Sequence, residues 1–285
     1  MHACTFPQVH EAADGADWRQ PENRLSTIQF LHREMARGKK ISPIFFVFGV
    51  FACLFKVDWL HATDKGVAAD FLGHEFAMLV KKMPGSTKQA RCNELSEYML
   101  AYYEEHNVED RLKELSPKTF EGGSATEPCK LSGSAAQIRA LVKFGHLMAQ
   151  KFLSDADPVE SAVKVAAHHL NNCYQALAAT SSPYSHAALF QSSKIFALQY
   201  YALFVRVGDG VAWRVMPKMH LFLELCSEGT EPQKFWCYRD EDFGGTMARQ
   251  SKMKGMWKKL SAYSKHGLDM FRMKNPAPRI TVHTT

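Results

Sequence analysis

The stretch that decides the fold is Val57-Asp58-Trp59-Leu60-His61-Ala62-Thr63-Asp64-Lys65-Gly66. It follows an apolar run over residues 44–55 and precedes a helical pattern over residues 65–82. The apolar run is rich in Phe and Val, which favours strands, and we expect a small β-hairpin of two strands at about 43–49 and 51–57. Two carboxylates and a histidine therefore stand where a strand ends and a helix begins. In α/β folds this position commonly carries the functional site.

The remainder of the chain predicts a mainly α protein. Apolar residues recur at helical spacing and are interrupted by Gly, Pro and Ser, which mark the helix ends. One helix start is explicit: Asp157 is an expected N-cap, Pro158 the first helical residue and Glu160 the third. The further predicted helices span residues 21–37, 88–106, 108–115, 134–153, 157–180, 185–207, 219–226 and 241–271.

Composition divides the chain into three parts. Residues 1–115 read as a partial α/β region that contains the strand–helix corner. Residues 116–133 are rich in Ser, Gly, Pro and Thr and are the best candidate for a linker. Residues 134–285 read as a helical region that ends in basic helices.

The charge is unevenly spread. The chain has a net charge of +6, and residues 249–279 alone hold nine Lys and Arg against one acid, Asp269. Such a segment suits contacts with DNA phosphates, and the alternative is a solvated basic helix face. The expected nucleic-acid contacts are Arg249, Lys252, Lys254, Lys258, Lys259 and Lys265.

Cysteine usage and hydropathy favour a reducing compartment. The seven cysteines form no CxxC pair and no zinc spacing, and the N-terminus has no apolar signal segment. The apolar run Ile41–Phe55 is 15 residues long and contains Pro43 and Gly49, whereas a bilayer span needs roughly 20. We therefore expect no membrane partner and a nuclear or cytoplasmic location.

Asp58, His61 and Asp64 form the first candidate site. Their spacing of three would place them on one helix face. Carboxylates and imidazole bind divalent cations, so one interpretation is a metal site or its surroundings. The other interpretation, which the spacing alone favours, is that Asp58, Thr63 or Asp64 caps the start of a helix.

A second candidate lies at residues 235–245, where three consecutive acids centred on Glu241 are flanked by aromatic residues and a Gly pair. Metal-binding acids followed by phosphate-binding cations are an arrangement that nucleases use. The alternative is that the acids complement a helix dipole. His220 lies in an apolar helix start and is expected to be a core histidine.

Two segments resemble a known family. Asp58-Trp59-Leu60-His61 followed by Leu72-Gly73 resembles the Asp-x-x-His segment of cut-and-paste DNA transposases of the CACTA and Plavaka kind. Pro217-Lys218-Met219-His220, with Trp236 to Gly245, resembles their Pro-Lys-x-His and aromatic-x-x-Glu region. The pairing also resembles transposon-derived proteins that are repeated in dinoflagellate genomes.

The resemblance implies a ribonuclease-H-like core with a helical insertion. It makes Glu241 the last catalytic acid, Asp58 and His61 a supporting pair, and Mg²⁺ or Mn²⁺ the cofactor of an active site. The first two acids of that family lie upstream of its Asp-x-x-His segment, but the residues before Asp58 contain no apolar strand that ends in Asp. We therefore expect a transposable-element-derived protein with an incomplete site and residual DNA binding.

Two alternatives remain open. One is a helical interaction or scaffold protein without chemistry. The other is an active metal-dependent transposase or nuclease that uses Asp58, Asp64 and Glu241 as metal ligands.

Overall fold

The computed structural model describes residues 26–48, 50–51, 56–120, 122, 127–178, 184–208, 210–234 and 236–238. The chain forms two compact units, Met1–Trp236 and Cys237–Thr285. Of the second unit, only Cys237 and Tyr238 are among the described residues. Helices hold 69% of the described residues, which confirms the mainly α prediction.

The described elements are all helical and are joined by connections of very different lengths. The long ones are α1 (Thr27–Ala36), η5 (Leu60–Ala68), α2 (Ala69–Lys82), α3 (Lys88–Glu105), α5 (Ala135–Phe152), α6 (Pro158–Ala178), α7 (His186–Val207) and α8 (Pro217–Ser227). The short ones are η3 (Pro43–Phe46), α4 (Pro117–Phe120) and η6 (Pro232–Lys234). None of the helices in these ranges combines the length and the apolar character that crossing a membrane requires.

The predicted hairpin at about 43–57 is not found. Residues 43–46 form the 3₁₀ helix η3, and the described part of the chain contains no strand or sheet. Pro43 stands at the start of η3, where its missing N–H costs nothing, and local bonds from Phe45 N to Ser42 O and from Val47 N to Ile44 O pair the backbone. Residues 49 and 52–55 lie outside the described residues. A ribonuclease-H-like core requires a sheet, so the described residues give that prediction no support.

Local capping signals place the helix ends close to where the sequence predicts them. Ser134 and Gln137 form a reciprocal capping box at the start of α5, and Asp157 Oδ1 accepts from Val159 N and Glu160 N at the start of α6. Gly208 ends α7 in the left-handed conformation, with φ 64°. The exception is residues 108–115, which are not helical.

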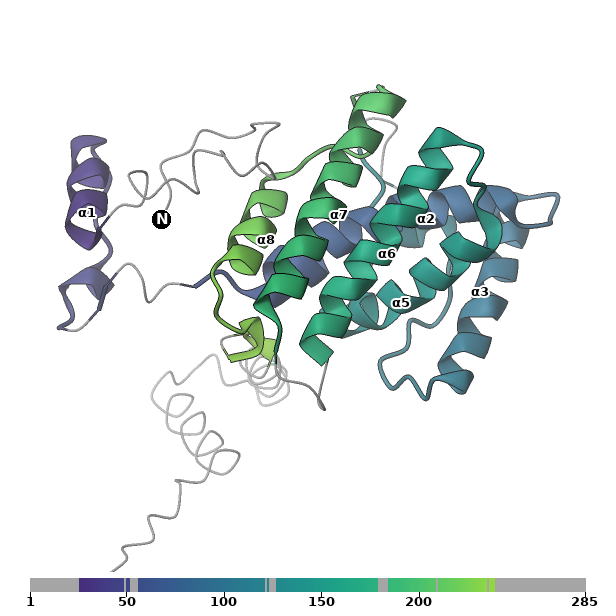
Figure 1. The fold of residues 1–285 in the computed structure, drawn as a ribbon, viewed down its shortest axis with the longest axis horizontal. Coiled ribbons are helices and arrows are strands. Elements are labelled where there is room, and N and C mark those ends of the chain that lie inside the picture. Colours follow the sequence, from purple (N-terminus) through teal and green to yellow (C-terminus); the bar gives the residue numbers. More distant parts are fainter. Residues whose placement is uncertain are drawn as a thin grey trace, which may run out of the picture. The chain divides into compact units, whose positions relative to one another are not determined.

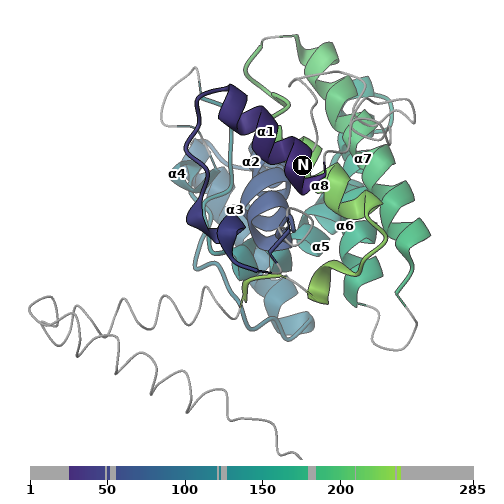
Figure 2. The same ribbon diagram turned by 90° about the vertical axis from the view of Figure 1, so that its left-hand side faces the viewer.

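Helices α5 to α8 pack as consecutive neighbours, and the continuous η5–α2 helix crosses behind them (Figure 1; Figure 2). The core lies between these layers. Its largest enclosed side chains are Trp59, Tyr103, Phe71, Phe76, Phe120, Phe144, Phe196 and Phe222. Besides α2, which continues it, η5 contacts α5 and α8, so the stretch quoted first in the sequence lies against two other helices.

Residues 116–133, which composition predicts to be a linker, lie within the first unit. Phe120 and Leu131 are buried in its core, and Leu131 N donates to Ala69 O at the start of α2. Gly73 permits this passage, because a Cβ on it would come within 2.5 Å of the Lys130 backbone. The described part of this segment is therefore held against α2.

Candidate functional site at the kinked helix start

The corner predicted from the sequence is a kinked helix start. η5 has π-helical bonding, in which each N–H reaches one residue further back than in an α-helix. The backbone leaves helical geometry at Gly66, with φ −117° and ψ −107°, before α2 continues. The start of this helix is therefore wider and less regular than an α-helix.

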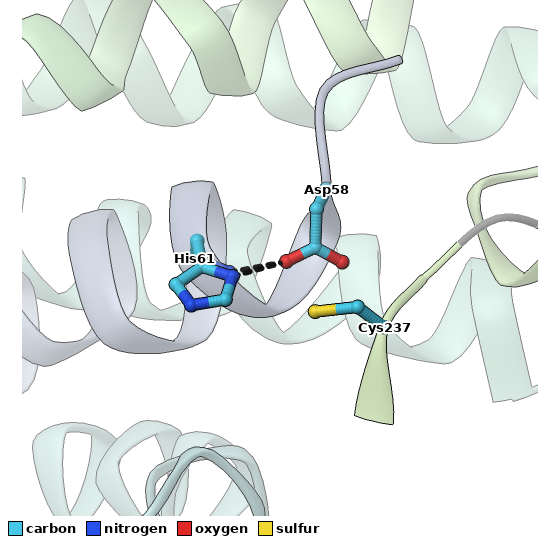
Figure 3. A group of neighbouring side chains, drawn as sticks. All are labelled: Asp58, His61 and Cys237. Carbon is cyan, nitrogen blue, oxygen red and sulfur yellow. Dashed lines mark hydrogen bonds and ion pairs between the residues drawn. The ribbon is translucent and has the colours of Figure 1, made fainter. Parts of the chain in front are cut away.

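Asp58 and His61 form a direct pair at the start of this helix (Figure 3). Asp58 Oδ2 accepts from the His61 backbone N–H at 2.9 Å and lies 2.7 Å from His61 Nδ1. The bond to the His61 backbone N–H is a helix N-cap, which confirms the capping interpretation for Asp58. The contact with His61 Nδ1 requires a proton on that nitrogen, because the Asp58 carboxylate can only accept. The His61 side chain is 62% exposed. Cys237, also drawn in Figure 3, belongs to the second unit.

Asp64 points into the core. It is fully buried, and its Oδ1 accepts a hydrogen bond from the hydroxyl of Tyr174 on α6. Burial raises the pKa of Asp64 to about 7, even though the Tyr174 hydrogen bond and the charge of Arg139 act in the opposite direction. A carboxyl in this environment is half protonated near neutral pH and has a protein partner already.

Trp59 and Arg139 lie beside this buried pair. The Trp59 ring meets the Tyr174 ring edge-on at 5.6 Å, and the Arg139 guanidinium lies over the Trp236 ring at 4.5 Å. The nearby Trp59 indole N–H lowers the pKa of Asp64, but neither Trp59 Nε1 nor Asp64 Oδ2 satisfies hydrogen-bond geometry with a described residue. Among the described residues, Tyr174 is thus the one side chain that donates a hydrogen bond to Asp64.

Residues 217–222, which open the second segment of the family resemblance, lie against the first segment. Lys218 Nζ donates to Lys65 O at 3.1 Å, and the Phe222 ring lies 5.9 Å from Trp59. Gly66 makes this contact close, because a Cβ there would lie 2.5 Å from Lys218 Cδ. His220 is buried, as predicted, with its Nε2 3.7 Å from Glu224 Oε2.

The predicted site residues thus fall into three groups. Asp58 and His61 contact each other at the surface, whereas Asp64 faces the interior on another side of the helix. The remaining predicted residues lie outside the described residues: Glu241, Arg249, Lys252, Lys254, Lys258, Lys259 and Lys265.

Sequence reasoning did not identify Glu75 and Tyr174. Glu75 on α2 is fully buried, neither of its carboxyl oxygens has a hydrogen-bond partner among the described residues, and burial raises its pKa well above the usual value. Its place inside the apolar pattern of Phe71, Phe76 and Leu79 is a signal that could have drawn attention to it. Tyr174 has no such signal, because nothing local links it to a residue 110 positions earlier.

Comparisons with known proteins add no relative. No protein-family model matches the sequence, and no curated protein or solved structure matches it either.

Proposed function

We propose that this chain is a helical DNA-binding protein, of the transposon-derived kind that its two motifs resemble, and that it does not cleave DNA itself. The observation that carries the second part is the state of Asp64. The charge pattern of the sequence supports the first part, and the resemblance supports the origin.

Metal-dependent cleavage needs ionised carboxylates that can face one or two cations. Asp64 has a pKa of about 7 and is enclosed by Trp59 and Tyr174. Binding Mg²⁺ or Mn²⁺ there would require the carboxyl to lose its proton and its tyrosine partner together. Asp58 is already used as a helix cap and as the partner of His61. This use of both acids by the fold argues against a catalytic role.

DNA binding is supported by the excess of cations in residues 249–279. Each phosphate that such a cation neutralises releases condensed counterions, so affinity depends steeply on salt. Our test measures binding of a fluorescent duplex by anisotropy across a salt series. The comparison variant replaces Lys252, Lys254, Lys258 and Lys259 with Gln.

We expect low-micromolar binding at low salt that weakens as salt increases. The four-lysine variant should show a log–log salt slope that is smaller by about 3 to 4 if each lysine meets a phosphate. Absence of binding, or binding that does not respond to salt, would refute the proposal.

Cleavage is tested separately, with the parent chain and Glu241→Gln in Mg²⁺ and in Mn²⁺. We expect no nicking by either protein. Cleavage by the parent that the Glu241→Gln substitution abolishes would instead establish the nuclease alternative.

A second candidate function, protein interaction, is favoured by the segment around η3. Its aromatic side chains are unusually exposed: Phe46 is 77% exposed and Phe48 is fully exposed. Exposed apolar groups of this size mark interaction surfaces. If this surface joins copies of the chain, the double substitution Phe46→Ser and Phe48→Ser should abolish the self-association that light scattering detects. A parent chain that does not self-associate would rule out a homo-oligomer.

A further inference from the structure

Three lysines from separate parts of the chain gather beside the kink at Gly66, together with the carboxylate of Asp70. Lys65 belongs to η5, Lys130 to the segment before α5, and Lys218 to the first turn of α8. Lys130 Nζ lies 2.7 Å from Asp70 Oδ1, and Lys218 Nζ lies 3.1 Å from Lys65 O. We call these three lysines with Asp70 the lysine cluster.

Two glycines bring the cluster together. A Cβ on Gly66 would lie 2.5 Å from Lys218 Cδ, and a Cβ on Gly73 would lie 2.5 Å from Lys130 Cα. Contacts under 3 Å force something to move, so both lysines reach their places because these two positions carry no side chain. The cluster therefore depends on the backbone of the corner and is more than a chance gathering of surface cations.

The charges in the cluster do not balance. Its three ammonium groups and one carboxylate leave a formal excess of two positive charges; Lys130 pairs directly with Asp70. Partial burial, followed by the charge of Lys130, lowers the pKa of Lys218; Asp70 acts in the opposite direction, and Lys65 lowers it further. Lys218, whose Nζ bonds to Lys65 O, is therefore the member that lies near both other lysines and near Asp70.

The ammonium groups also retain hydrogen-bonding capacity. Within the described residues each makes one hydrogen bond, of the three that an ammonium group can donate: Lys65 to Gly133 O, Lys130 to Asp70 and Lys218 to Lys65 O. The first turn of α8 adds to the positive potential, because Met216 supplies no side-chain cap to it. A compact anion with several acceptor oxygens matches both the charge and the donors.

We propose that the lysine cluster is a binding site for a phosphate group. This inference rests on the proposed function for its natural ligand, a phosphate of the DNA backbone, but the chemistry applies equally to a free polyphosphate. All four residues of the lysine cluster belong to the first unit, whereas the basic segment 249–279 belongs to the second.

The probe that separates the two ligand sources is inorganic tripolyphosphate, with binding measured by isothermal titration calorimetry. Duplex DNA is measured in parallel by anisotropy. The loss variant is Lys65→Met with Lys218→Met, which keeps the apolar stems. The matched control is Lys143→Met, which removes an exposed lysine from α5. We expect the loss variant to bind tripolyphosphate at least about tenfold more weakly, and the control to bind like the parent.

Circular dichroism will show whether the loss variant folds. If it does not, a second variant that should bind tripolyphosphate more tightly keeps the test decisive. Asp70→Asn removes the only negative charge of the cluster, and it should tighten tripolyphosphate binding by about fivefold. Unchanged or weaker binding by folded Asp70→Asn would overturn the site.

The two ligands distinguish the site from the proposed function. If DNA binds but tripolyphosphate does not, and the loss variant binds DNA like the parent, the site is refuted while DNA binding stands. If tripolyphosphate binds and depends on the lysines but DNA does not bind, the site holds and the DNA-binding function fails. If neither ligand binds, both proposals fail.

Discussion

Tyr174 on α6 donates its hydroxyl to Oδ1 of Asp64 in η5, so two buried polar groups 110 residues apart in the chain satisfy one another. Each is enclosed by the same apolar surroundings, which also raise the pKa of Tyr174 well above its usual value. The bond joins the kinked helix start to the centre of the bundle. It is therefore the polar contact whose removal tests the fold around the corner most directly.

Tyr174→Phe should destabilise the protein by roughly 1–3 kcal/mol, because it leaves the buried carboxyl of Asp64 without its donor. The measurement is the free energy of unfolding in urea near neutral pH. Tyr98→Phe is the matched control, since the Tyr98 ring packs against Phe152 and Lys151 at a half-buried position. Equal stabilities of the two variants would contradict the importance of the Asp64 bond.

The same carboxyl predicts how stability depends on pH. The pKa of Asp64 is about 7 in the folded protein against 3.8 for the unperturbed group, so between these values the folded state holds a proton that the unfolded state has lost. The stability that Asp64 contributes is then fully present below about pH 4 and is lost as the pH rises through 7. Each pKa unit corresponds to about 1.4 kcal/mol, so the effect amounts to several kcal/mol.

Asp64→Asn should remove this loss, and its stability should decline less than that of the parent between pH 4 and 7. Glu75 contributes a slope of the same sign in both proteins, so the informative quantity is the difference between the two urea-unfolding profiles. Asp110→Asn, at an exposed position, is the control and should follow the parent. Parallel profiles for Asp64→Asn and the parent would mean that Asp64 titrates normally.

Asp58 distinguishes a helix cap from a metal ligand. Asp58→Ala should cost about 0.5–2 kcal/mol, whereas Asp58→Ser, which can still accept from His61 N, should lose little. Thermal unfolding with and without Mn²⁺ measures both effects. We expect Mn²⁺ to change the thermal unfolding midpoints of the parent and of Asp58→Ser by the same amount. A change in the parent alone would identify Asp58 as a metal ligand.

The helices were predictable because their signals are local. Two helix starts are marked by residues no more than three positions apart, Ser134 with Gln137 and Asp157 with Glu160. The structure of the apolar run around Pro43 was not predictable in this way. Its Phe and Val residues favour a strand, while the Pro at its start allows a 3₁₀ turn.

The arrangement of the candidate site was only partly predictable. Spacing predicted that Asp58, His61 and Asp64 share a face, which holds for the first two. The wider turn of η5 and the core contact with Tyr174 carry Asp64 inward, and neither feature has a sequence signature. Long-range partners of this kind are chosen by packing, which a local pattern does not contain.

Glu75 offers a stabilising substitution. Its carboxyl is enclosed between α2 and α5, with Oε2 2.5 Å from where a Cβ on Gly145 would stand, and both oxygens are unpaired among the described residues. Glu75→Met has a similar volume and removes the cost of burying a polar group, so it should raise the free energy of unfolding by roughly 1–3 kcal/mol. Glu97→Met, at an exposed position on α3, should change it by less than about 0.5 kcal/mol. A destabilised Glu75→Met variant would instead indicate that the carboxyl has a structural role.

His74 holds an unusual turn in place. Trp213 is buried with a φ of 59°, a left-handed conformation that is strained for a large side chain, and its backbone N–H donates to His74 Nε2 at 3.2 Å. His74→Phe would keep an aromatic ring against Trp213 but leave the buried N–H unpaired, so we expect a loss of roughly 1–3 kcal/mol in the free energy of unfolding in urea. His74→Gln supplies a new acceptor and should recover part of that loss. Trp213 fluorescence contributes a local readout, because a released turn exposes the indole and shifts its emission to longer wavelength, and an unchanged spectrum and stability in His74→Phe would show that the turn holds without His74.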